Sequence, residues 1–116
     1  MLITVGITAY RRLQYLEKAV ESVLRQDFAS FEVLISQNPH SDREVTESIA
    51  RLCREVAERN SRVRFRSNKE NIGVAENINA IADDAHGDFL FLLGDDDLLL
   101  PNGLSSLARY VGPNTD

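Results

Sequence analysis

Three consecutive carboxylates, Asp95, Asp96 and Asp97, directly follow the apolar run Phe89–Leu93. Adjacent like charges repel and destabilise a fold unless a cation neutralises them. A hard divalent ion, Mn²⁺ or Mg²⁺, prefers such oxygen ligands and usually combines one or two carboxylates with phosphate oxygens. The triplet therefore predicts a metal–diphosphate site. The alternative is a solvated acidic turn that caps the next helix.

A second group of side chains that could bind a ligand follows the apolar run Leu2–Ile7; it consists of Thr8, Tyr10 and Arg11. A hydroxyl can hydrogen-bond the edge of a nucleobase, an aromatic ring can stack on its face, and a guanidinium suits phosphate. This loop is a candidate nucleotide site. The alternative is ordinary loop chemistry, with Tyr10 packed on the first helix.

Polar amides follow two further runs. Gln37 and Asn38 come after the run Phe31–Ile35, where they either read a base edge or form a turn before the helix that Asp42 caps. Residues 68–73 form another turn, in which the expected role of Gly73 is to open a helix. Asn77 and Asn79, in that helix, either line the same cleft or face water.

Four apolar runs alternate with four helical patterns, which predicts a parallel α/β sheet with right-handed crossovers. The predicted strands are Leu2–Ile7, Phe31–Ile35, Arg62–Arg66 and Phe89–Leu93. The predicted helices are Arg12–Gln26, Asp42–Arg59, Val74–Ala85 and a last one that begins near Pro101.

The strand sequences also predict their order. The first and fourth runs are apolar on both faces and should be central, whereas Arg62–Arg66 alternates and should lie at an edge. Order 3-2-1-4 places a switch point between strands one and four, where parallel sheets bind ligands. We expect a Rossmann-like, three-layer α/β/α domain over residues 1–116. The far edge of Phe89–Leu93 should be covered by more chain or another subunit, and it favours self-association.

The composition excludes several classes of protein. A net charge of −5, from 18 acidic and 13 basic residues, argues against a nucleic-acid binder. Apolar runs all fall short of the ~18 residues of a membrane span. Cys53 is the only cysteine and is expected in the core. We expect a cytoplasmic protein, either free or peripheral to the inner face of a membrane. A receiver-like domain fits poorly, because the second strand ends in Ser36-Gln37-Asn38 rather than aspartate.

Five stretches in order carry a family pattern: Val5–Arg11, Tyr15–Gln26, Phe31–Ile35, the pair Arg62–Arg64 and Asn71–Gly73, and Gly87–Pro101. Together they resemble the N-terminal, nucleotide-binding half of the family 2 glycosyltransferases, which have the GT-A fold. The resemblance implies transfer of a sugar, with inversion, from a nucleotide-diphosphate donor to an acceptor hydroxyl, assisted by Mn²⁺ or Mg²⁺. UDP is the default nucleotide, with dTDP and GDP as alternatives.

The resemblance also implies roles for single residues. Thr8 and Tyr10 would contact the base, and Arg11 belongs to the same donor site. Asn38 stands where the family often has a base-binding aspartate, and Gln37 also replaces a frequent aspartate. Asp95 would reach the ribose or diphosphate. Asp96 would be the chief metal ligand, with Asp97 beside it. If the pattern Asp-x-Asp is instead matched literally to Asp95 and Asp97, the assignment of the metal ligand shifts by one residue.

The family's general base lies in its second half, with the acceptor site, and no residue here matches it. The resemblance therefore implies that the base lies beyond Asp116, the last residue of the sequence. We expect the donor-binding portion of a larger enzyme, with little turnover alone. The acceptor, whether saccharide, lipid-linked or protein, stays open. The other hypothesis is a non-catalytic α/β module that binds a nucleotide or a metal.

Overall fold

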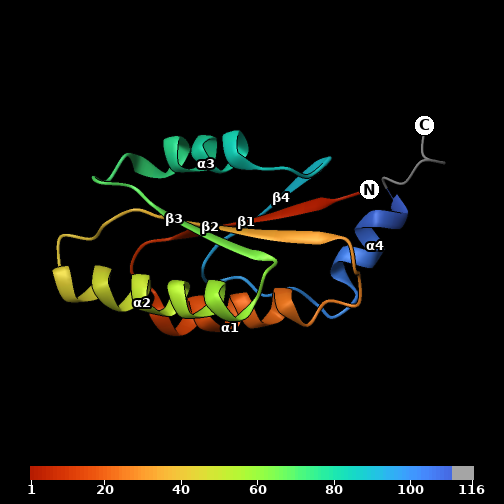
Figure 1. Ribbon diagram of the computed structural model, residues 1–116, viewed down its shortest axis with the longest axis horizontal. Coiled ribbons are helices and arrows are strands. Elements are labelled where there is room, and N and C mark those ends of the chain that lie inside the picture. Colours follow the sequence, from red (N-terminus) through yellow and green to blue (C-terminus); the bar gives the residue numbers. More distant parts are fainter. Residues whose placement is uncertain (111–116) are drawn as a thin grey trace.

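The structure is a computed structural model in which residues 1–110 are described, and strands and helices alternate along the chain (Figure 1). The strands are β1 (Ile3–Ala9), β2 (Phe31–Gln37), β3 (Val63–Ser67) and β4 (Phe89–Leu93). The helices are α1 (Leu13–Leu24), α2 (Arg43–Arg59), α3 (Gly73–Asp84) and α4 (Gly103–Tyr110). Each predicted element is confirmed, with small shifts at its ends.

The sheet is parallel throughout, in the order β3-β2-β1-β4, which confirms the predicted α/β architecture. Val5 of β1 lies opposite Val33 of β2 on one side and Phe91 of β4 on the other. The sheet therefore extends from β1 in both directions, because β2 and β4 lie on opposite sides of it. The loops after β1, β2 and β4 meet at one edge of the sheet, the position where open α/β sheets bind ligands.

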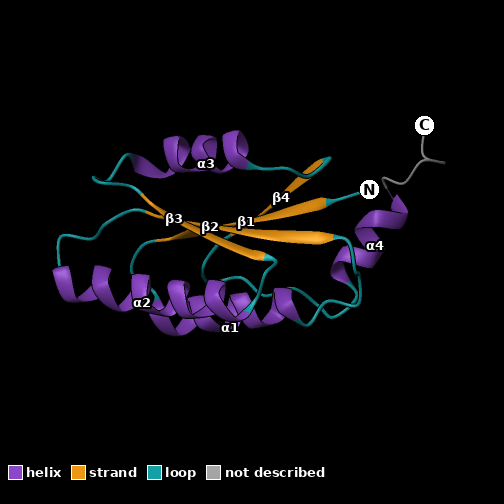
Figure 2. Ribbon diagram, viewed as in Figure 1, coloured by secondary structure: helices purple, strands orange, loops and turns teal. Residues whose placement is uncertain are grey.

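The two faces of the sheet differ in what covers them. Helices α1 and α2 pack on one face and α3 on the other (Figure 2). The main core lies on the α1–α2 side, where Ile3, Val5 and Ile7 are fully buried. On the α3 side, a Cβ added to Gly6 would lie 2.6 Å from Ile81 Cγ2. The absence of a side chain at Gly6 therefore lets α3 approach β1 closely.

Both predicted helix starts are confirmed. The Asp42 carboxylate accepts a hydrogen bond from the Glu44 N–H (2.9 Å) and caps α2. Gly73 begins α3 with a φ of +85°, a conformation that side chains disfavour. The helical pattern that predicts α3 rests on an apolar stripe that begins at Val74, and this first member is wrong, because Val74 is 72% exposed. In the first turn of α3, Gly73 and Val74 line a cavity, and Asn77 is buried instead.

The prediction that β4 is central is wrong for the described residues. β4 pairs only with β1, and the other edge of β4 has no strand partner among residues 1–110. Phe89, Leu90 and Leu92 are consequently 36–44% exposed. The apolar sequence that indicates burial on both faces thus forms an exposed edge here. Self-association through this edge stays a prediction.

The carboxylate of Glu32, at the amino ends of the strands, links neighbouring strands of the sheet. Glu32 accepts hydrogen bonds from Thr4 Oγ1 (2.5 Å), His86 N (2.7 Å) and Arg64 Nη2 (3.2 Å). Burial pushes the pKa of Glu32 upward, but these hydrogen bonds and the Arg64 charge outweigh it and hold the pKa below its ordinary value. His86 directly follows Ala85, the C-cap residue of α3, and its N–H links the α3–β4 connection to β2.

Cys53 is buried in the core as predicted, and burial raises the pKa of its thiol to about 12.

Of the helices within residues 1–110, all are too short or too polar to cross a bilayer.

Candidate functional site

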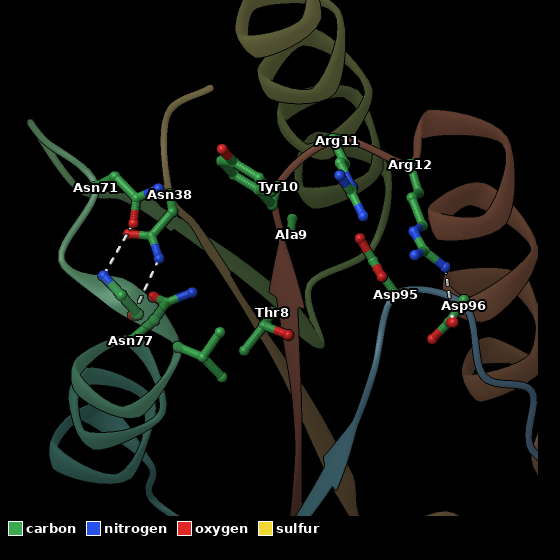
Figure 3. Close-up of a pocket in the computed structure, with 12 residues that line it drawn as sticks. Thr8, Ala9, Tyr10, Arg11, Arg12, Asn38, Asn71, Asn77, Asp95 and Asp96 are labelled. Carbon is green, nitrogen blue, oxygen red and sulfur yellow. Dashed lines mark hydrogen bonds and ion pairs between the residues drawn. The ribbon is translucent and has the colours of Figure 1, made fainter. Parts of the chain in front are cut away.

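A cavity of about 390 Å³ opens at the carboxyl ends of the strands, between α3 and the loops that follow β1 and β4 (Figure 3). It joins segments that lie far apart in the sequence, as the switch-point argument predicts. The residues that line it are Thr8, Ala9, Tyr10, Arg11, Arg12, Asn38, Asn71, Gly73, Val74, Asn77, Asp95 and Asp96.

The end of β1 forms the middle of the cavity. Thr8 stands opposite Ser36 in the sheet register, and Tyr10 follows the last residue of the strand. The Tyr10 ring packs against His40, with ring centroids 5.0 Å apart and planes tilted by 47°. His40 lies in the loop after β2, so the aromatic contact is across the sheet edge rather than onto the first helix. Tyr10 is thereby held at the rim of the cavity.

One side of the cavity consists of three side-chain amides, Asn38, Asn71 and Asn77, which we call the amide wall (Figure 3). Asn38 follows β2, Asn71 precedes α3, and Asn77 lies in the second turn of α3. Asn38 and Asn77 are only 5% and 2% exposed, and both hydrogen-bond to neighbouring elements. This side of the cavity is neutral and tightly held.

The opposite side carries charge, and we call Arg11, Arg12, Asp95 and Asp96 the charged wall (Figure 3). Arg12 Nη1 and Asp96 Oδ2 form an ion pair at 2.9 Å, with both side chains well exposed. Burial raises the pKa of Asp95 and the neighbouring Asp96 charge adds to this, while Arg12 and Arg11 oppose it. The Arg11 guanidinium points toward Asp95. Two positive and two negative side chains thus lie together on this wall, and Arg12–Asp96 is the ion pair that the described residues form there.

Asp97, the third carboxylate of the acidic turn, is absent from the residues that line the cavity. Its Oδ2 accepts a hydrogen bond from Gly94 N (3.1 Å), while its own N–H donates to Gly94 O (3.1 Å). Asp97 therefore stabilises the turn that presents Asp95 and Asp96. Within residues 1–110, no group of three His, Cys, Asp or Glu side chains is arranged to hold a metal ion.

The family model described as Glycosyl transferase family 2 matches residues 4–116, nearly the whole chain. The chain belongs to glycosyl transferase family 2. This confirms the resemblance carried by the five sequence stretches.

Two curated relatives illustrate the membership. The chain is 28% identical over 116 residues to "Abequosyltransferase RfbV" of Salmonella typhimurium, covering 100% of this chain and 34% of that protein. It is 32% identical over 108 residues to "GalNAc(5)-diNAcBac-PP-undecaprenol beta-1,3-glucosyltransferase" of Campylobacter jejuni, covering 92% and 33%. The chain thus spans about a third of the length of these glycosyltransferases.

Two solved structures share the fold. S. aureus TarS, crystallised in complex with UDP, superposes with a TM-score of 0.82 at 19% identity, over 96% of this chain and 32% of that one. The mannosyltransferase PcManGT of Pyrobaculum calidifontis, in complex with GDP-Man and Mn²⁺, gives a TM-score of 0.81 at 19% identity, with the same coverage. These neighbours have the GT-A fold, as the sequence predicts for this family member.

In this family 2 domain, six of the seven predicted site residues line one cavity: Thr8, Tyr10, Arg11, Asn38, Asp95 and Asp96. Asp97 does not, and sequence reasoning did not single out Arg12 or Asn71. Asn77 had a signal in the sequence, because it is a polar residue four positions before Ile81, on the face of the helix that packs on the sheet. Arg12 had none beyond its place next to Arg11.

The general base is the one catalytic group that the resemblance places away from this cavity. It is expected beyond Asp116, and Asp116 itself lies outside the described residues, which end at Tyr110. The position of the base therefore stays a prediction.

Proposed function

We propose that this chain is the nucleotide-sugar-binding portion of an inverting, metal-assisted glycosyltransferase. The observation that carries the proposal is the single cavity that joins the loop after β1 to the acidic turn after β4. Membership of glycosyl transferase family 2 supports transferase activity in the whole protein. The chain matches about a third of the length of its relatives, which supports placing the acceptor site outside these 116 residues.

The middle of the cavity would receive the nucleoside. Tyr10 offers a ring that His40 already holds from one side, and Thr8 offers a hydroxyl next to it. An aromatic ring of fixed orientation can stack on a base with little loss of side-chain entropy. The base would therefore lie beside Tyr10 on the side of the amide wall, and the diphosphate would extend toward the charged wall.

The charged wall would receive the diphosphate. The guanidiniums of Arg11 and Arg12 suit phosphate oxygens, because their planar donors match two oxygens at once. Arg12 now pairs with Asp96, but both side chains are exposed, at 40% and 48%. Such an ion pair contributes about 1 kcal/mol or less, so an arriving diphosphate can take over Arg12.

The residues of the acidic turn fit a divalent cation by their chemistry. Asp95 and Asp96 present carboxylate oxygens to the cavity, and Mn²⁺ or Mg²⁺ is commonly held by two carboxylates together with phosphate oxygens of a substrate. Burial is the largest cause of the raised pKa of Asp95, and a bound cation would offset that cost. When bound, such an ion stabilises the charge that grows on the leaving diphosphate. Asp97 would keep its position in the turn and hold the two ligands in place.

The reaction would be a single in-line displacement. The oxygen of an acceptor hydroxyl forms a bond to the anomeric carbon while the bond from that carbon to the diphosphate oxygen breaks, which inverts the configuration. A carboxylate base takes the hydroxyl proton. We place that base beyond Asp116 and expect this chain alone to bind donors with little turnover.

Calorimetry tests the proposal directly. The folded 116-residue chain is titrated with a panel of nucleoside diphosphates, with and without Mn²⁺. We expect binding that Mn²⁺ strengthens and that loses its dependence on Mn²⁺ in Asp96→Ala. Asp83→Ala is the matched control, because Asp83 is an exposed carboxylate of α3 away from the cavity.

Two outcomes would count against the proposal. Unchanged Mn²⁺ dependence in Asp96→Ala would reject the metal ligand. Absence of heat with every nucleotide, in a chain that is folded by circular dichroism, would favour the non-catalytic module.

A further inference from the structure

The amide of Asn38 has an orientation that the backbone determines. Its Oδ1 accepts from Ile72 N (3.2 Å), and its Nδ2 donates to Gly73 O (3.1 Å). A backbone N–H can only donate and a carbonyl can only accept, so the two ends of this amide cannot be exchanged. Asn68 Nδ2 donates a second hydrogen bond to Oδ1 (3.0 Å). Both lone pairs of the oxygen are used, and one N–H of Asn38 is left.

The other two members of the amide wall have the same polarity. Asn71 Oδ1 accepts from Gly73 N (2.9 Å), which leaves the Asn71 NH₂ group for other partners. Asn77 Nδ2 donates to Ser36 O (3.0 Å), while its Oδ1 accepts from Ser36 Oγ (2.6 Å) and Asn68 Nδ2 (3.0 Å). One N–H of Asn77 also remains. Within the described part of the chain, the remaining N–H groups of these three amides have no hydrogen-bond acceptor.

The amide wall is therefore a wall of donors. All three oxygens accept hydrogen bonds from the protein, and those of Asn38 and Asn77 are saturated. A ligand group that meets this wall with an N–H of its own would leave buried donors unpaired, which is unfavourable. A ligand group with acceptors would satisfy them. Sites built to hydrogen-bond a particular group discriminate strongly against analogues that lack it.

We infer that the amide wall selects a nucleobase whose edge presents two adjacent hydrogen-bond acceptors and disfavours uracil and thymine. Cytosine presents such a pair at N3 and O2, and guanine presents one at N7 and O6. Uracil and thymine carry an N–H between their two carbonyl groups. This inference rests on the proposed function, since it takes the ligand of the cavity to be a nucleoside diphosphate.

An aspartate at position 38 would reverse the preference. A carboxylate there offers acceptors and suits the N–H of uracil, as the resemblance to the family implies. In this chain a carboxylate oxygen in the place of Asn38 Nδ2 would face the Gly73 carbonyl oxygen at about the 3.1 Å that the amide now spans. The backbone at the start of α3 thus favours asparagine, and with it a remaining N–H donor in place of a second acceptor.

The test measures affinity for four nucleotides. The folded 116-residue chain is titrated calorimetrically with CDP, GDP, UDP and dTDP at one fixed Mn²⁺ concentration. We expect CDP or GDP to bind about tenfold or more tightly than UDP and dTDP, the discrimination of one good pair of hydrogen bonds. The comparison of CDP with GDP decides which base supplies the acceptors.

The outcomes separate the two proposals. If UDP binds as tightly as both CDP and GDP, or more tightly, the selection by the amide wall is overturned and the proposed function stands. If none of the four nucleotides binds to the folded chain, the proposed function fails and the selection fails with it.

Asn71→Asp tests the wall itself. The substituted side chain still accepts from Gly73 N but exchanges an exposed NH₂ donor for an acceptor, so folding should be unaffected. The added negative charge weakens the binding of every nucleotide, and the readout is therefore the ratio of the affinities for different nucleotides. We expect the preference for CDP or GDP over UDP to fall several-fold. Asn79→Asp, an exposed change of the same charge in α3 outside the cavity, should leave the ratio unchanged. An unchanged ratio in Asn71→Asp would overturn the inference.

Discussion

Carboxylates at the two ends of the sheet meet opposite surroundings. Glu32, at the amino ends of the strands, accepts three hydrogen bonds and has a lowered pKa. Asp95, at the carboxyl ends, is partly buried beside another carboxylate and has a raised pKa. The first carboxylate is satisfied by its own protein and holds strands together. In the proposed function, a bound cation would offset the cost of burying the charge of Asp95. The comparison thus separates a carboxylate that the protein itself satisfies from one that is a candidate ligand for an ion.

The largest effect on stability should come from substituting Glu32, whose carboxylate already accepts hydrogen bonds from the protein. Glu32→Gln places an amide N–H among donors that need an acceptor, so we expect the free energy of unfolding to fall by about 2 kcal/mol. Urea denaturation measures it. The exposed Glu47→Gln on α2 is the control and should change stability by less than about 0.5 kcal/mol.

The same measurement on Asp96→Ala sharpens the comparison. That variant should stay close to the wild type in stability, within about 1 kcal/mol, because its ion pair is exposed. A loss of stability as large as that of Glu32→Gln would show that the acidic turn is structural rather than poised for a ligand.

The pH dependence of stability should separate the two ends next. Because the pKa of Glu32 is lower in the folded chain, its contribution is fully present above the ordinary carboxyl value of 4.5 and is lost as the pH falls through the folded value. The stability gap between wild type and Glu32→Gln should therefore be widest at about pH 7 and close toward about pH 3. Urea midpoints at several pH values check this. A gap that widens on acidification would contradict the assignment.

The smallest effect should come from the charged wall. Arg12→Gln removes the cation that competes for Asp96, so Mn²⁺ alone should bind up to about fivefold more tightly, the equivalent of about 1 kcal/mol. Calorimetry without nucleotide measures this. Arg51→Gln, at an exposed arginine of α2, is the control. Weaker Mn²⁺ binding in Arg12→Gln would mean that Arg12 orients Asp96 for the ion instead of competing with it.

Local pattern in the sequence predicts the framework well. The alternation of Arg62–Arg66 places β3 at an edge, and the continuous apolar run of β1 places it in the middle. From strand order alone, the loop with Tyr10 and the turn with Asp95 are expected at one crevice, and they line one cavity. The β4 run fails as a guide, because burial of a strand depends on its neighbours and its outer edge has none within residues 1–110.

The details of the site depend on contacts that the sequence does not express. The Arg12–Asp96 pair joins residues 84 positions apart. Asp97 turns to Gly94 because of local backbone geometry, although its neighbours in sequence have the same charge. The polarity of Asn38 follows from two backbone groups before and at the start of α3. Such properties emerge only when the chain is folded.

Gly6 sets the width of the ligand crevice from the middle of the sheet. Since a methyl group there would press on Ile81, the spacing between β1 and α3 depends on this one missing side chain. Helix α3 carries Asn77 on the same underside, one turn closer to the crevice. A larger residue at position 6 would lift the whole helix and draw Asn77 away from Tyr10, altering which ligands fit without contacting any of them.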